Sequence, residues 1–158
     1  DICEAAQLTK GAFYHHFDSK EALYQHLYTP QLDTYLASHF SISEDADGKT
    51  LLLALADATL SFSEEIGREM TSLSITVMLS RGTSHLFTEG RVHTRLLHQA
   101  LSQSQAGNQL KCEGSEHELM LIYSCLMVGF LVKWASLADE SNFDWHNLLQ
   151  REMQLMFC

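Results

Sequence analysis

The chain has 158 residues, of which 46% are hydrophobic, and its formal net charge is −10. This length suits one domain, or one domain with a small appendage, and the apolar content is sufficient for a packed core. The acidic balance argues against broad, non-specific binding of nucleic acid, because neutralising phosphates requires lysine and arginine. A small DNA-reading surface on an otherwise acidic body is compatible with this charge.

The chain shows no uninterrupted run of about 20 apolar residues and no signal-peptide pattern, so we predict no membrane span and no membrane partner. It begins at Asp1 in the middle of a helical pattern, and we expect further residues upstream. Four cysteines form neither a CxxC pair nor a zinc motif: Cys3, Cys112, Cys125 and Cys158. They are expected to be free thiols in a reducing cytoplasm, with a redox sensor at Cys112 as the alternative.

Apolar residues recur at helical spacing along the whole chain, and no segment alternates long enough to indicate a strand. The segments with helical spacing are about 19–40, 50–66, 70–82, 84–105, 116–138 and 144–157. Pro30 lies inside the first segment and is expected to kink or break it. Gly67 is expected to end the second segment, and Asn142 or Asp144 to cap the last. The sequence therefore predicts an all-α protein.

The segment 116–138 is apolar on most of its surface, so it must be buried on more than one side. In a domain of this size, a second copy of the chain is the favoured cover for the additional face. We therefore predict a homodimer formed through the last two helices, residues 116–138 and 144–157. An ordinary core within one chain is the alternative.

Residues 1–23 have the pattern of two short helices joined by a turn. Apolar side chains pair one turn apart within each helix and, with Leu8 between them, suit a small core: Ile2, Ala6, Phe13 and Phe17. Thr9 is a suitable N-cap for the second helix. A helix, a turn of three or four residues and a second short helix make up the layout of a helix-turn-helix.

The polar side of this second helix suits a nucleic-acid groove. Lys10 and the backbone N–H groups at the helix start can bind phosphate, and Gly11 permits close approach of the backbone. Tyr14 and His15 can donate hydrogen bonds to phosphate oxygens. Lys20 lies in the first turn of the next helix, where the helix dipole disfavours a cation unless an external anion is bound.

The adjacent histidines of this stretch also raise the question of a metal or catalytic site. A shared metal is disfavoured because His15 and His16 project about 100° apart on a helix. A catalytic site is disfavoured because the spacing supplies neither a nucleophile nor a carboxylate to orient a histidine. A solvated polar face remains the main alternative to DNA binding, since acidic neighbours oppose Lys10 and Lys20.

The stretch AAQLTKGAFYHHFDSKEAL (residues 5–23) resembles the signature of TetR/AcrR-family transcriptional regulators. Residues 9–11 match the start of the family's recognition helix, 13–17 its core and contact positions, and 19–23 the start of the next helix. Gln7 replaces the family's usual turn glycine, and Ala12 replaces its usual threonine. The DNA-contact residues that the motif and the resemblance together indicate are Thr9, Lys10, Gly11, Ala12, Tyr14, His15 and Lys20.

The resemblance implies a DNA-binding domain in residues 1–28, incomplete upstream, and a helical ligand-binding and dimerisation domain in residues 29–158. Methionine and aromatic side chains suit an adaptable apolar pocket in the second domain. The candidate pocket residues are Phe62, Met70, Met78, Phe87, Tyr123, Met127, Phe130 and Trp134. Ordinary core packing is the alternative for each of them. Basic residues that would anchor an anionic ligand if they point inward are Arg81, Arg91, Arg95 and His98.

The chain has no GxSxG, phosphate-binding loop or HExxH motif and no paired Glu-x-x-His motifs, so we predict no enzyme, no metal site and no cofactor. The resemblance implies a cytoplasmic, homodimeric DNA-binding transcriptional regulator. It is expected to be a repressor released from a double-stranded DNA operator by a small-molecule effector of unknown identity. The alternative is a non-enzymatic ligand-sensing or scaffold protein on the same fold that does not bind an operator.

Overall fold

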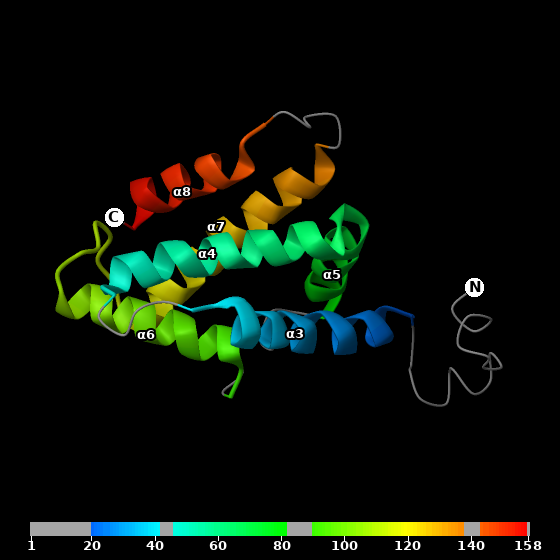
Figure 1. Cartoon of the computed structure of the whole chain (residues 1–158), viewed down its shortest axis with the longest axis horizontal. Coiled ribbons are helices and arrows are strands. Elements are labelled where there is room, and N and C mark those ends of the chain that lie inside the picture. Colours follow the sequence, from blue (N-terminus) through cyan, green and yellow to red (C-terminus); the bar gives the residue numbers. More distant parts are fainter. Residues whose placement is uncertain (1–19, 42–45, 82–89, 138–142, 158) are drawn as a thin grey trace.

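The computed structural model describes residues 20–41, 46–81, 90–137 and 143–157. These residues form six helices, which pack as a bundle (Figure 1): α3 (Lys20–His39), α4 (Gly48–Ile66), α5 (Arg68–Arg81), α6 (Val92–Ala106), α7 (Glu116–Ser136) and α8 (Trp145–Met156). No strand occurs in these ranges. The predicted all-α fold is therefore confirmed.

Local side-chain chemistry sets where three of the helices begin. At the start of α4, the Asp47 carboxylate accepts a hydrogen bond from a first-turn backbone N–H at 2.7 Å, and Asp144 does the same for α8 at 2.9 Å. At α7, Ser115 and Glu118 form a capping box, in which the Glu118 carboxylate accepts from the Ser115 backbone N–H at 2.8 Å. Gly67, with φ of +85°, ends α4 as predicted.

Helix α3 continues through Pro30 to His39, so the expected break is wrong. A proline within a helix removes one backbone hydrogen bond, but packing on the rest of the helix can keep the chain helical. Leu32 and Leu36, which follow Pro30 on one face of α3, are buried in the core. The expected domain boundary between residues 28 and 29 falls inside α3, so this one helix is common to both predicted domains.

The predicted helix over residues 84–105 is wrong at residues 90 and 91, because α6 begins at Val92. Gly90 has φ of +92°, which no residue of a right-handed helix adopts, and Arg91 is extended. Residues 84–89 lie outside the described part of the chain. The apolar spacing of this segment continues across Gly90, so the periodicity did not indicate that the chain turns at this glycine.

Helix α4 passes through the middle of the bundle, with α3 and α6 on one side and α8 on the other (Figure 1). Its side chains Leu52, Leu55 and Leu60 are completely buried, and removing such apolar surface from water is the main favourable contribution to folding. Helix α4 approaches α6 closely at Gly48, where an added Cβ would overlap the backbone nitrogen of Ser104. Only glycine fits this crossing without a shift of the backbone.

Helix α7 is the one described helix that is long and apolar enough to cross a membrane by length and composition. In the bundle, its buried residues form part of the core: Leu119, Met120, Tyr123, Met127, Phe130, Leu131 and Trp134. Core packing therefore accounts for one side of this apolar helix.

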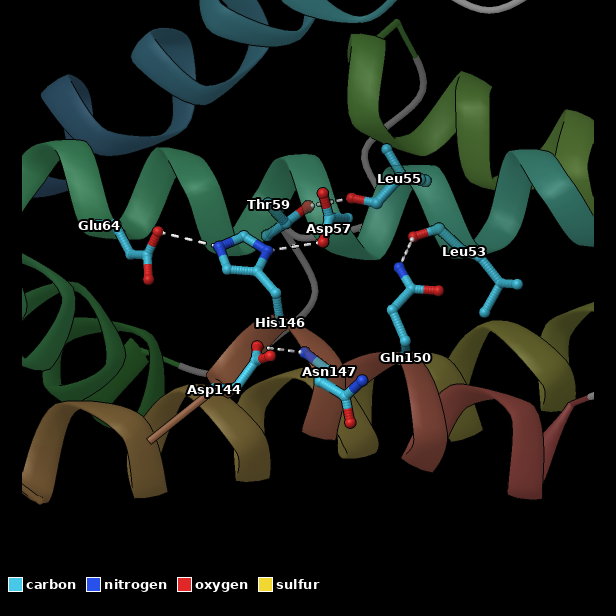
Figure 2. Close-up of polar contacts among 9 residues, drawn as sticks. All are labelled: Leu53, Leu55, Asp57, Thr59, Glu64, Asp144, His146, Asn147 and Gln150. Atoms are coloured by element: carbon cyan, nitrogen blue, oxygen red, sulfur yellow. Dashed lines mark hydrogen bonds and ion pairs between the residues drawn. The ribbon is translucent and has the colours of Figure 1, made fainter. Parts of the chain in front are cut away.

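Polar contacts attach α8 to α4 on the side of α4 away from α3 (Figure 2). The imidazole of His146 lies between the carboxylates of Asp57 and Glu64, and the Gln150 side chain donates to the Leu53 carbonyl at 3.3 Å. The two carboxylates meet opposite nitrogens of the ring, so they do not converge on one point. In the described ranges, no three His, Cys, Asp or Glu side chains are grouped to hold a metal ion.

Candidate functional site

A largely apolar pocket of about 110 Å³ lies between α3, α4, α5, α7 and the start of α6. Most of the residues that line it were not selected from the sequence, among them Tyr28, Leu32, Thr59, His93 and Leu131. The spacing of Tyr28 and Leu32 on α3 was a usable signal, because residues four apart share one face of a helix. The others could not be selected from the sequence, because they come together only where helices distant in the chain enclose the pocket.

Three of the eight candidate pocket residues line this space: Met78 of α5 and Tyr123 and Met127 of α7. Tyr123 and Met127 lie one helical turn apart, so α7 presents both to the pocket from one face. The choice of methionine and aromatic residues as pocket candidates therefore agrees with the lining that α7 provides. Phe87 lies outside the described residues.

The other four candidates do not line the pocket: Phe62, Met70, Phe130 and Trp134. Phe130 packs edge-on against Trp145, with ring centroids 5.9 Å apart, and the Arg68 guanidinium lies 4.9 Å from the centre of the Trp134 ring. Arg68 also donates to the backbone carbonyls of Trp134 and Leu137. For Phe130 and Trp134, the alternative of ordinary packing is the one the geometry favours.

An ion pair beside the pocket connects α3 to the start of α6. The Asp33 carboxylate accepts from Arg91 Nε at 3.2 Å and from Arg91 Nη2 at 3.5 Å, and also from the backbone N–H of His93 at 3.1 Å. Arg91 itself provides no side-chain cap for α6. Asp33 therefore supplies from α3 both a partner for the arginine and a negative charge at the α6 N-terminus.

Two titratable groups of the pocket are held uncharged at neutral pH. Burial, together with the nearby Arg91 charge, lowers the pKa of His93 to about 4, although Asp33 acts in the opposite direction. Burial raises the pKa of Tyr123, and the neighbouring Thr59 hydroxyl offsets only part of this rise. The Tyr123 hydroxyl makes no hydrogen bond at ordinary bonding distance with any described residue.

The basic residues considered as anion anchors have other arrangements. Arg91 lines the pocket but is paired with Asp33, and Arg95 is exposed to solvent. His98 is exposed and lies 2.6 Å from the Glu116 carboxylate. The side chain of Arg81 is outside the described set. Within the described residues, the pocket thus has one cationic lining group, and that group has a counter-ion.

A second hollow, open to solvent, lies on the outer face of α7 and α8. Its volume is about 590 Å³, and it is lined by Leu121, Ile122, Cys125, Leu126, Glu152, Leu155 and Met156. Of these residues, Leu121, Leu155 and Met156 are exposed, and Val132 further along α7 is exposed as well. We call the seven residues that line the hollow the α7–α8 face. Of the cysteines in the described residues, Cys125 is exposed on this face and Cys112 is half-buried; both are free thiols.

The candidate DNA-contact residues precede the described bundle. Thr9, Lys10, Gly11, Ala12, Tyr14 and His15 lie outside the described residues, and Lys20 is the first residue of α3. α3 then continues without interruption to Tyr28 and Leu32 at the pocket. One helix therefore leads from the edge of the N-terminal motif to the wall of the pocket.

The fold and site define a helical bundle with a small pocket, whose first described helix follows the N-terminal segment that carries the predicted motif. Residues 1–27 match the family model described as bacterial regulatory proteins, tetR family. This match confirms the resemblance that the N-terminal motif predicted, and it supports a TetR-family regulator, within a family of DNA-binding transcriptional regulators. No curated protein and no solved structure matches the chain.

Proposed function

We propose that this chain is a cytoplasmic transcriptional regulator that binds a double-stranded DNA operator as a homodimer and acts as a repressor released by a small molecule. The observation that carries the proposal is the match over residues 1–27, on a chain whose helix α3 begins within the match and lines a pocket further along. The pocket lining is mostly apolar, and its His93 and Tyr123 are uncharged at neutral pH, which suits a ligand sensor rather than an enzyme. The proposal therefore assigns the chain no catalytic step and no cofactor.

Release by a ligand would act through α3. Tyr28, Thr29 and Leu32 form one wall of the pocket, and α5 and α7 form others. A molecule that fills this space favours one position of α3 relative to α5 and α7, and it shifts the population of DNA-binding arrangements accordingly. Asp33 limits the movement of α3 relative to α6, because its carboxylate accepts three hydrogen bonds from Arg91 and His93 at the start of α6.

The α7–α8 face supports the homodimer. It brings exposed apolar side chains of both helices together around one hollow, and Glu152 is the one charged residue of its lining. Exposed apolar patches of this kind mark interaction sites, and a self-complementary patch gives a closed two-fold dimer. The proposed occupant of this face is therefore a second copy of the chain.

Operator binding is the test of the proposed function. The full-length protein would be titrated into fluorescently labelled DNA from upstream of its own gene, at salt concentrations between 50 and 200 mM, which are about the range over which phosphate contacts respond. Tight binding at a two-fold-symmetric site, with affinity falling steeply as salt rises, is the expected result. Absence of binding at every salt concentration would favour the alternative, a ligand-sensing or scaffold protein on the same fold.

A further inference from the structure

The volume of the pocket limits its occupant to a small molecule. A cavity of about 150 Å³ lined by apolar side chains is large enough for benzene. The pocket between α3, α5 and α7 measures about 110 Å³ and is partly open to solvent. Its walls carry Leu32, Ile75, Val77, Met127 and Leu131, which give apolar contact on several sides. This enclosed space is smaller than the benzene cavity, so a single ring with a short substituent fits only if part of the molecule lies toward the open side, and fused-ring or long-chain molecules exceed it.

The wall of the pocket also contains an unsatisfied donor. Tyr123 is 1% exposed, and its hydroxyl has no hydrogen-bond partner among the described residues. Its neighbour Thr59 donates its own hydroxyl proton to the Leu55 carbonyl at 2.8 Å, and the Thr59 oxygen lies near the Tyr123 hydroxyl without meeting ordinary hydrogen-bond geometry. A buried polar group without a partner costs free energy, and a ligand that supplies the acceptor recovers it.

The charges around the pocket disfavour an ionic ligand. An anion would have to compete with Asp33 for Arg91, and Asp33 is also held by the His93 backbone N–H at 3.1 Å. A cation would find no carboxylate among the lining residues that the structure describes. Moving an ion from water into apolar surroundings without a partner is strongly unfavourable. An uncharged molecule avoids both penalties.

We infer that the pocket binds an uncharged, single-ring aromatic molecule that carries one hydrogen-bond acceptor, and that the Tyr123 hydroxyl donates to this acceptor. This inference rests on the proposed function, since it names the chemical class of the effector. Tyr35, further along α3, does not line the pocket. Tyr123 and Tyr35 thus provide a site variant and a control.

Three probes of one size test the class directly: acetophenone, ethylbenzene and benzoate. Binding to the 158-residue chain would be measured by NMR chemical-shift titration at pH 7. Acetophenone is expected to bind about tenfold more tightly than ethylbenzene, the ratio given by one net hydrogen bond. Benzoate is expected to bind at least tenfold more weakly than acetophenone. Tighter binding of benzoate would overturn the inference and assign Arg91 as an anion anchor.

The variants then test the residue. Tyr123→Phe is expected to abolish the preference for acetophenone over ethylbenzene, while Tyr35→Phe, outside the pocket lining, keeps it within about twofold. Because the Tyr123 hydroxyl lacks a partner without ligand, Tyr123→Phe should leave the melting temperature unchanged or raise it. A lowered melting temperature, or an unchanged probe preference in Tyr123→Phe, would overturn the role of this hydroxyl.

The outcomes separate this inference from the proposed function. Operator binding with no detectable binding of any probe would overturn the ligand class and leave the regulator intact. Selective acetophenone binding without operator binding would support the ligand class and overturn the regulator in favour of the sensor alternative.

Discussion

The Nδ1 atom of His146 in α8 lies 2.6 Å from the Asp57 carboxylate of α4, and its Nε2 atom lies 3.0 Å from Glu64, about two turns further along the same helix (Figure 2). The imidazole thereby joins the last helix to the central one at two points. Partial burial lowers the pKa of His146, but its hydrogen bonds to Asp57 and Glu64 and their negative charges outweigh this effect, so the pKa is raised above 6.5.

This contact predicts a pH-dependent attachment of α8. Because the pKa of His146 is higher in the folded chain than in the unfolded chain, protonation stabilises the fold. The contribution is complete below about pH 6.5 and is lost as the pH rises through the raised pKa. Since all three side chains are well exposed, solvent screening limits it to about 0.5 kcal/mol. Chemical denaturation of wild type and His146→Gln at pH 5.5 and 8.5 would measure it; an equal difference between the two proteins at both pH values would contradict it.

The Asp33–Arg91 pair predicts a larger effect, because its side chains are only 20% and 11% exposed. Asp33→Ala removes one partner of a poorly hydrated guanidinium and the acceptor of the His93 N–H, and we expect it to lower the free energy of unfolding by about 2 kcal/mol. Urea denaturation monitored by circular dichroism gives this value. The exposed pair His98–Glu116 is the control: Glu116→Gln should change stability by less than about 0.5 kcal/mol. Equal losses in the two variants would contradict the buried role of Asp33.

The crossing of α4 and α6 predicts opposite effects for two helical glycines. Gly48→Ala places a Cβ where it would overlap the Ser104 backbone nitrogen, so the backbones must move apart, and we expect a loss of about 1–3 kcal/mol in the free energy of unfolding. Gly129→Ala meets nothing within 4 Å, and the better helix propensity of alanine should add up to about 1 kcal/mol. Thermal unfolding of both variants compares them. A Gly48→Ala protein as stable as wild type would show that the crossing tolerates a side chain.

The α7–α8 face predicts which apolar surface residue controls self-association. Leu155→Glu puts a charge at the hollow, next to Glu152 in the same lining. It should lower the association constant of the dimer at least tenfold, so that less dimer is present at micromolar concentration. Leu79 of α5 is similarly exposed, 69% against 73%, but lies outside this face, so Leu79→Glu should leave association unchanged. Sedimentation equilibrium measures both. A wild-type monomer at all concentrations would exclude the proposed dimer.

The N-terminal motif predicts losses of DNA affinity without loss of fold. Tyr14→Ala and Lys20→Ala should each weaken operator binding by about tenfold, and Lys20→Ala should also reduce the salt dependence, because it removes one phosphate contact. Lys49→Ala, the same charge change at the start of α4, is the control and should leave affinity within about twofold. Fluorescence anisotropy gives the affinities, and circular dichroism checks the helix content. Wild-type affinity in both Tyr14→Ala and Lys20→Ala would remove this surface from the DNA interface.

The sequence alone determined the helical class, most helix ends and the family motif, because these depend on neighbouring residues. Asp144 could be identified as a cap and Gly67 as a stop from local chemistry, and the motif over residues 5–23 predicted the family-model match over residues 1–27 without any tertiary information. Pro30 shows the limit of local rules: the proline predicts a kink or a break, and α3 does not break there, because Leu32 and Leu36 of the same helix pack in the core.

The tertiary structure decided which inward-facing residues line the pocket and which pack against another side chain. Helical spacing places both Met127 and Phe130 on the inner side of α7, but only the position of α8 makes Phe130 pack on Trp145, and only the positions of α3 and α5 leave room beside Met127. The same holds for Asp33 and Arg91, whose pairing depends on two helices far apart in the chain coming side by side. Periodicity fixes the direction of a side chain relative to its own helix, whereas its partner depends on how the helices pack around the common core.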